Sequence, residues 1–146
     1  MALITLGANS GKGKVVQVVS SGEATPATIN STSYVLSISL AITPTSASNK
    51  ILIKFDGQYQ IDDADGHTSS TKLTRTVGGT ETTIFDQSTG RDITEGAGFS
   101  SPNFAKLDET NTTSEVTYKV YGKSANSSSD WRTRPHTMLN AFEILG

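Results

Sequence analysis

Three consecutive stretches decide the fold, and they read YVLSISLAI (residues 34–42), TPTSASN (43–49) and KILIKFDGQYQI (50–61). In the first and the third stretch apolar residues occupy every second position, which is the period of a strand that buries one face. Pro44 has no N–H to give to a β-ladder, and the Ser, Thr and Asn residues after it are typical of a turn. We therefore expect a pair of strands whose shared apolar face contains Tyr34, Leu36, Ile38, Leu40, Ile42, Ile51, Ile53 and Phe55.

Two strands alone are not stable in water, so a second apolar layer must cover this pair. The remaining candidate strands are residues 14–20, 70–77, 80–87, 99–107, 113–122 and 136–145, with an irregular segment at 131–135. Gly78-Gly79 is a signal for a two-residue hairpin, and Pro102 predicts an edge strand or a bulge. We expect an all-β fold, an antiparallel β-sandwich or jelly roll of eight or nine strands spanning residues 14–146.

Apolar residues near both ends of the chain are expected to contact surfaces that the sequence does not identify. The strand expected at 14–20 (KVVQVVS) is apolar on both faces, which suits either an interior position in a sheet or a subunit contact. Residues 1–13 predict a short N-terminal arm for attachment or subunit contact, because GANSGKG is a flexible composition. Three apolar residues of this arm, Leu3, Ile4 and Leu6, need a surface to lie on, either the domain's own or that of a neighbour. The alternative is a frayed terminus. In the last expected strand Met138, Phe142 and Ile144 share one side.

Composition excludes several classes of function. Ser and Thr fill roughly a quarter of the 146 positions and 18% of residues are charged, which favours β-structure with polar outer faces. The net charge of −2 gives no field to attract nucleic acid or anionic lipid. The chain has no cysteine, and it contains no apolar run of about twenty residues. We therefore expect no nucleic-acid partner, no disulfide or thiolate metal site and no membrane insertion.

An acidic turn follows the third stretch and contains the candidate cation ligands Asp62, Asp63 and Asp65. A calcium loop needs oxygen ligands at positions one, three and five, Gly at six and Glu at twelve. With Gly66 at position six, Ile61 falls at position one and Lys72 at position twelve. The motif is broken, so an ordinary acidic turn is the favoured interpretation and a bound cation the alternative.

Catalytic constellations are not indicated. His67 and His136 are the only imidazoles, and they lie far apart in the sequence. A Ser-His-Asp set could be assembled from so many serines and aspartates that the combination has no specificity. We expect a protein that is not an enzyme and that needs no cofactor.

The segment WRTRP combines one aromatic plate with two guanidinium groups, on Trp131, Arg132 and Arg134. Such a set could stack on a sugar or a base. The competing interpretation is that Trp131 covers the open end of the sandwich. Coverage of the open end by Trp131 is the favoured interpretation, and a ligand contact, with a host surface glycan as the candidate ligand, is the alternative.

Several segments resemble a pattern in small virion proteins of tailed bacteriophages and in the terminal, knob-like domains of phage tail fibres. They are KVVQVV (14–19), TSYV (32–35), ITPTSASNKILI (42–53), TYKV (117–120) and FEILG (142–146). The resemblance implies a homotrimeric β-sandwich that is made in the host cytoplasm and displayed on the exterior of the virion. The segments that carry the resemblance contain no catalytic residue.

The resemblance leaves two roles open. One is the tip of a tail fibre or short appendage that contacts the host, with the arm held by a tail component. The other is a capsid decoration protein that clamps the major capsid protein and stabilises the shell. Fibre members of the group carry a long shaft before this domain, whereas about thirteen residues precede the first expected strand here. A carbohydrate-binding module is a third alternative.

Overall fold

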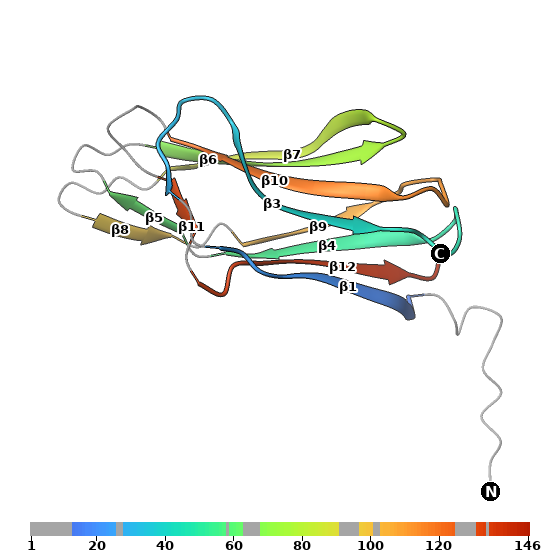
Figure 1. Ribbon diagram of the computed structural model, residues 1–146. Helices are drawn as coiled ribbons and strands as arrows, with labels where there is room; N and C mark the ends of the chain where they lie inside the picture. The colour runs from blue at the N-terminus through green and yellow to red at the C-terminus, as the bar shows by residue number, and fades with distance from the viewer. Residues whose placement is uncertain are drawn as a thin grey trace, which may run out of the picture.

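The computed structural model describes residues 13–25, 28–57, 59–62, 68–90, 97–100, 103–124, 131–133 and 135–146. These residues form twelve antiparallel strands and no helix (Figure 1). The strands are β1 (Val15–Glu23), β2 (Thr28–Ile29), β3 (Val35–Ile42), β4 (Lys50–Asp56), β5 (Tyr59–Asp62), β6 (Thr68–Val77), β7 (Thr80–Gly90), β8 (Ala97–Ser100), β9 (Phe104–Asp108), β10 (Val116–Lys123), β11 (Trp131–Thr133) and β12 (Met138–Ile144). Because no described helix exists, none is long and apolar enough to span a membrane.

Two four-stranded sheets form the layers of a sandwich. Sheet I has the order β1-β12-β4-β9, and sheet II has the order β3-β10-β6-β7. Figure 1 shows sheet II stacked over sheet I, with the core between them. Twelve buried apolar side chains from both sheets make up this core: Ile38, Leu40, Ile42, Ile51, Ile53, Phe55, Leu73, Val116, Tyr118, Val120, Leu139 and Ala141. The expected all-β antiparallel sandwich is thereby confirmed.

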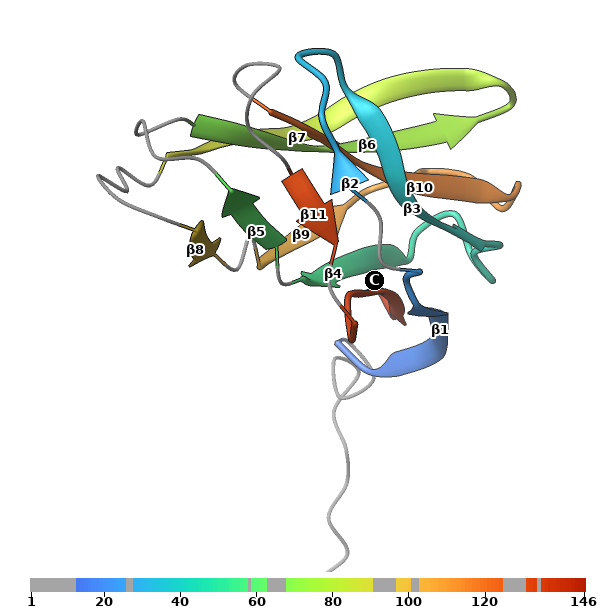
Figure 2. The same ribbon diagram turned by 60° about the vertical axis from the view of Figure 1, so that its left-hand side comes forward.

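A third sheet of short strands, sheet III, has the order β2-β11-β5-β8. Each of its strands neighbours one strand of sheet I in the sequence, and the order across the two sheets is the same. Sheet III therefore continues sheet I beyond a line at which all four strands are interrupted (Figure 2). The segments expected as single strands at 50–61 and 99–107 are each split in two by this line, and the segment expected to be irregular at 131–135 contains β11.

Local chemistry explains two of the interruptions. Gly57 is buried, and a Cβ there would lie 2.6 Å from Cζ of Phe55, so a larger residue would displace that ring. The N–H of Gly57 donates to Oδ1 of Asn103 at 2.8 Å instead of to a ladder partner. Pro135 and His136 form the turn before β12, where His136 adopts a φ of 71°. Gly57 thus follows the end of β4, and the turn at Pro135 and His136 separates β11 from β12.

The strands at 35–42 and 50–56 do not pair with each other, which corrects the expectation from the sequence. β3 pairs with β10 in sheet II, and β4 pairs with β12 and β9 in sheet I. The seven residues between them cross from one layer to the other, with Pro44 and Asn49 buried in the crossing. The two apolar faces therefore meet across the core rather than forming one face.

A β-bulge in β3 reverses which side chains face the core at the start of that strand. Val120 is opposite Ile38, but the next residue, Tyr121, is opposite Leu36, so Ser37 is an extra residue. A one-residue shift moves a side chain to the other face of a sheet. Leu36 is consequently 49% exposed, whereas the sequence predicted that it would be buried.

The hairpin expected at Gly78-Gly79 is present between β6 and β7, where Val77 is opposite Thr80. Both glycines have positive φ, 55° and 83°. Such values are those of a two-residue turn whose twist matches the flanking strands.

Candidate assembly surface

The outer face of sheet I carries a row of apolar side chains. Leu139, Ala141 and Glu143 of β12 point into the core, so Phe142 between them points outward. The pairing register places four outward residues on one line across the four strands, and this apolar row is Val18, Phe142, Leu52 and Leu107. The two end members are 57% (Val18) and 47% (Leu107) exposed.

Charged residues flank the apolar row. Lys50 and Lys54 lie two residues before and after Leu52 on β4. Lys50 forms an ion pair with Glu109, and Nζ of Lys54 lies 2.9 Å from Oδ2 of Asp56. An apolar centre with a polar rim is the usual anatomy of a protein contact surface.

Strand β1 lies at the edge of sheet I among the described residues, where it pairs with β12 alone. The interior position that its sequence allowed is therefore not the observed one. Val15, Val16 and Val18 all lie exposed on this edge strand. The subunit contact, which was the other interpretation of this two-faced strand, stays a prediction.

A buried carboxylate holds the crossing between the two layers. Glu143 is fully buried, and its Oε1 accepts from the N–H of Thr45 at 2.7 Å, from Oγ1 of Thr45 at 2.8 Å and from Nδ2 of Asn49 at 2.7 Å. With its amide nitrogen turned toward the carboxylate, Gln17 of β1 donates to Oε2 at 3.0 Å. Burial alone would raise the pKa of Glu143, but the hydrogen bonds from Asn49 and Thr45 outweigh it, so the pKa is lowered.

The end of the chain joins the same cluster. The N–H of Gly146 donates to Oδ1 of Asn49 at 3.3 Å. A Cβ at Gly146 would lie 2.0 Å from the carbonyl oxygen of Ser48, so only glycine fits. Two of the segments that carry the phage resemblance, 42–53 and 142–146, are therefore in direct contact.

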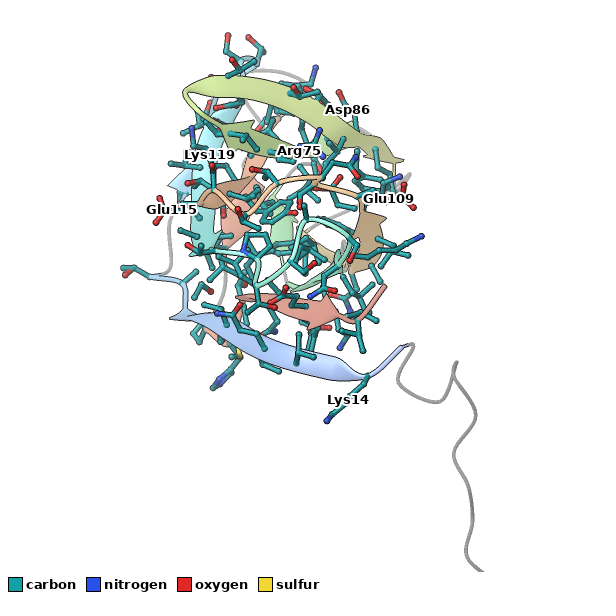
Figure 3. All side chains as sticks on the ribbon, turned by 90° about the vertical axis from the view of Figure 1, so that its right-hand side faces the viewer. Lys14, Arg75, Asp86, Glu109, Glu115 and Lys119 are labelled. Carbon is teal, nitrogen blue, oxygen red and sulfur yellow. The ribbon has the colours of Figure 1, made fainter. Side chains whose placement is uncertain are left out.

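A second polar cluster joins the layers through Arg75, Asp108 and Tyr118. Nη1 of Arg75 lies 2.8 Å from Oδ1 of Asp108 and donates to the carbonyl oxygen of Glu109 at 3.2 Å (Figure 3). The Tyr118 hydroxyl donates to Oδ2 of the same carboxylate at 2.8 Å. Burial and this bond to Asp108 raise the pKa of Tyr118. The cluster therefore links the two sheets of the sandwich.

The outer face of sheet II is polar and aromatic. The Tyr34 hydroxyl donates to Oδ1 of Asp86 at 2.6 Å. The ammonium groups of Lys72 and Lys123 lie over the Tyr34 ring, 4.3 Å and 4.7 Å from its centroid. Burial, followed by the bond to Asp86, raises the pKa of Tyr34 to about 12.

The same face contains a second group of paired side chains. Nζ of Lys119 lies 2.7 Å from Oε2 of Glu81, and the Tyr121 hydroxyl donates to Oε1 of Glu81 at 2.9 Å. The hydrogen bond from Lys119, followed by that from Tyr121, lowers the pKa of Glu81 to about 2. Glu81, Lys119 and Tyr121 are thus engaged with one another.

Most of the site residues expected from the sequence lie outside the described residues. These are Leu3, Ile4 and Leu6 of the arm, Asp63 and Asp65 of the acidic turn, His67, and Arg134. Asp62 is the last residue of β5, with its backbone opposite Ala97. No group of three or more residues of the kinds that bind metals is found in the part of the chain that the structure describes.

Trp131 and Arg132 are placed by their backbone. Both belong to β11, where Trp131 is opposite Ile29 and Ile61, and Arg132 is opposite Thr28 and Gln60. β11 lies inside sheet III at one end of the sandwich (Figure 2). The ligand contact expected at these residues stays a prediction.

Comparison with known proteins shows the fold. No protein-family model matches the chain, and no curated protein sequence does. A chain in the structure of infectious bursal disease virus, Gt strain, is similar over 89% of this chain, with a TM-score of 0.51 and 12% identity. This chain spans only 38% of the length of that one. The Gx strain of the same virus and its VP2 subviral particle give TM-scores of 0.47 and 0.46.

Proposed function

We propose that the protein is a non-enzymatic structural component of a virion that assembles as a homotrimer on the exterior of the particle. The observation that carries the proposal is the outward-facing apolar row Val18, Phe142, Leu52 and Leu107, whose two end members are exposed. The sequence resemblance to phage virion proteins supports it, as does the similarity in fold to a chain of a virus. In this proposal the chain is made in the host cytoplasm and then joins the particle.

The first candidate role is the tip of a tail fibre or appendage that takes part in host attachment. The resemblance to tail-fibre terminal domains favours this role. A tail component would then hold the protein, and the distal end of the sandwich would face the host.

The second candidate role is capsid decoration, in which the protein clamps copies of the major capsid protein. The similarity in fold to a chain of an infectious bursal disease virus structure favours this role. Particles that carry Leu107→Lys, a change at one end of the apolar row, separate the two candidates. Loss of adsorption to the host with intact shells supports the fibre tip. Shells that rupture in low salt or on heating, with adsorption intact, support decoration.

A glycan-binding role at the sheet III end is the third candidate, resting on Trp131, Arg132 and Arg134. Purified wild-type protein on a glycan array tests it, with Trp131→Ala as the comparison. Binding that the substitution abolishes would support the role. A blank array for the wild type would remove it. Turnover that depends on Asp63, Asp65 or His67 would contradict the non-enzymatic proposal.

A further inference from the structure

The dimensions of the apolar row indicate what covers it. The row crosses four strands, which is three spacings of about 4.8 Å, or roughly 14 Å. Along β4 it is one residue deep, since Lys50 and Lys54 bound Leu52. A stable contact between two domain faces buries about 800 Å² on each partner, and the apolar row alone is much smaller than that. The strip fits one extended peptide that crosses the strands.

The chain contains a peptide of the right length and chemistry. Residues 1–7 read MALITLG, and five extended residues at about 3.3 Å each cover the row. Leu3, Ile4 and Leu6 provide apolar side chains on both sides of such a segment. We propose that the N-terminal arm, residues 1–12, of one copy lies across the apolar row of a neighbouring copy. This inference rests on the homo-oligomer proposed above.

The hydrogen bonds before β1 fix the point at which the arm begins. The N–H of Gly13 donates to the carbonyl oxygen of Leu145 at 3.1 Å, and the N–H of Leu145 donates to that of Lys14 at 2.9 Å. These two bonds hold the backbone of Gly13 and Lys14 beside Leu145, so the arm starts at the end of sheet I, five residues along the chain from Val18.

Return of the arm to its own row leaves almost no slack. From Gly13 back to the level of Val18 is about 17 Å, whereas residues 7–12 span at most about 20 Å fully extended. A reversal of direction would use most of that difference and several of those residues. The same linker reaches a sheet placed beyond the end of β1 without any reversal.

Arm-to-face contacts also account for a closed trimer. The arm of one copy and the sheet of the next are different surfaces, so the contact is heterologous. Such contacts form a ring when the rotation between copies closes, and three copies complete the proposed homotrimer. Every apolar row is then covered and every arm is bound.

Cysteine cross-linking tests the proposal in the full chain, because the protein has no cysteine of its own. Ile4→Cys lies in the middle of the apolar arm, and Leu52→Cys lies in the middle of the row. One batch with Ile4→Cys and another with Leu52→Cys are denatured, mixed, refolded together and oxidised. The control pairs Ile4→Cys with Leu36→Cys, an exposed apolar residue on the outer face of sheet II.

We expect a disulfide between two chains in the Ile4/Leu52 mixture, with a yield about tenfold or more above the Ile4/Leu36 control. A chain that carries both Ile4→Cys and Leu52→Cys should then give covalent oligomers. A double variant that closes its disulfide within one chain would overturn the proposal, because the arm would cover its own sheet. Equal cross-linking with the control would overturn it as well.

Sedimentation of the unmodified protein separates this inference from the proposed function. A trimer without the Ile4–Leu52 cross-link means that the copies associate through another surface, so the proposed homotrimer stands and the arm contact fails. A monomer at micromolar concentration removes the homotrimer itself. Leu3, Ile4 and Leu6 all changed to Asp should weaken association at least about tenfold, in common with Leu107→Lys.

Discussion

Sheets I and II carry different side chains on their outer faces. Sheet I keeps Glu143 and Asp108 on the inner side, and its outer face carries the apolar row. Sheet II contributes Arg75 to the inner side, where it pairs with Asp108, and its outer face carries Glu81 and Lys119, which pair with each other. The polar groups named on the outer face of sheet II are thus satisfied within one molecule, although Leu36 is exposed there, whereas the proposed function gives the apolar row of sheet I a partner. The difference favours sheet I as the assembling face of the proposed homotrimer.

The inner carboxylate of sheet I should have the largest effect on stability. We expect Glu143→Ala to lower the free energy of unfolding by about 3 kcal/mol, because the buried donors of Thr45 and Asn49 lose their acceptor. Denaturation in urea measures the change. Glu81→Ala is the matched control on the outer face of sheet II, and we expect it to cost less than about 1 kcal/mol. Equal losses would contradict the distinction between the two sheets.

Loss of the Tyr118–Asp108 hydrogen bond between the two layers should have the second largest effect on the free energy of unfolding. Tyr118→Phe removes the hydroxyl that donates to Asp108 but keeps the packing of the ring. A hydrogen bond to a charged group contributes about 1.5–3 kcal/mol, so we expect a loss of about 2 kcal/mol in thermal or urea unfolding. Tyr121→Phe, on the outer face of sheet II, is the control and should cost less. A neutral Tyr118→Phe would mean that Arg75 alone satisfies the carboxylate.

Lowering the pH should remove the stability contributed by the same carboxylate, that of Glu143, over a range of pH. The pKa of Glu143 is lower in the folded chain than its ordinary value of 4.5. Its contribution to stability is therefore present above that value and is lost as the pH falls through the folded pKa. Urea midpoints measured between pH 7 and pH 3 should fall less steeply for Glu143→Gln than for the wild type. Parallel curves would show that Glu143 is not the group responsible.

The smallest effect on stability is expected at the apolar row. Leu107 is exposed on an edge strand, so Leu107→Lys should change the free energy of unfolding of one copy by no more than about 0.5 kcal/mol. Leu36→Lys on the outer face of sheet II should be equally neutral. Sedimentation should nevertheless distinguish the two, since only Leu107→Lys is expected to weaken association. Loss of association in both variants would contradict the assignment of sheet I as the assembling face.

The sequence predicted the strands better than it predicted their partners. Period-two alternation located β3, β4 and β10, and Gly78-Gly79 located the β6–β7 hairpin. The same pattern does not say which strands share a sheet, so β3 and β4 were paired wrongly. One extra residue, Ser37, exposed Leu36, and a bulge leaves no signal in the spacing of apolar residues.

The sequence did not reveal the candidate site, because in β12 the aromatic residue faces outward and the charged residue faces the core. In β12 the apolar residues Phe142 and Ile144 alternate with Glu143, which suggests that the apolar side faces the core. The structure shows the opposite, because Thr45 and Asn49 satisfy the carboxylate inside. A glutamate flanked by aromatic and β-branched residues, together with a crossing segment rich in donors, was the available signal. It becomes readable only when the two segments are known to meet.

The hydrogen bond between Gly13 and Leu145 holds the two ends of the folded domain together at one end of the sandwich. The start and the end of the folded domain emerge side by side, while β5, β8 and β11 lie at the far end of the sandwich (Figure 1). A body fused to either terminus would therefore sit behind the domain and leave the far end pointing outward. The domain is consequently suited to serve as a display scaffold, in which a peptide grafted beside β11 would be carried away from whatever anchors the ends.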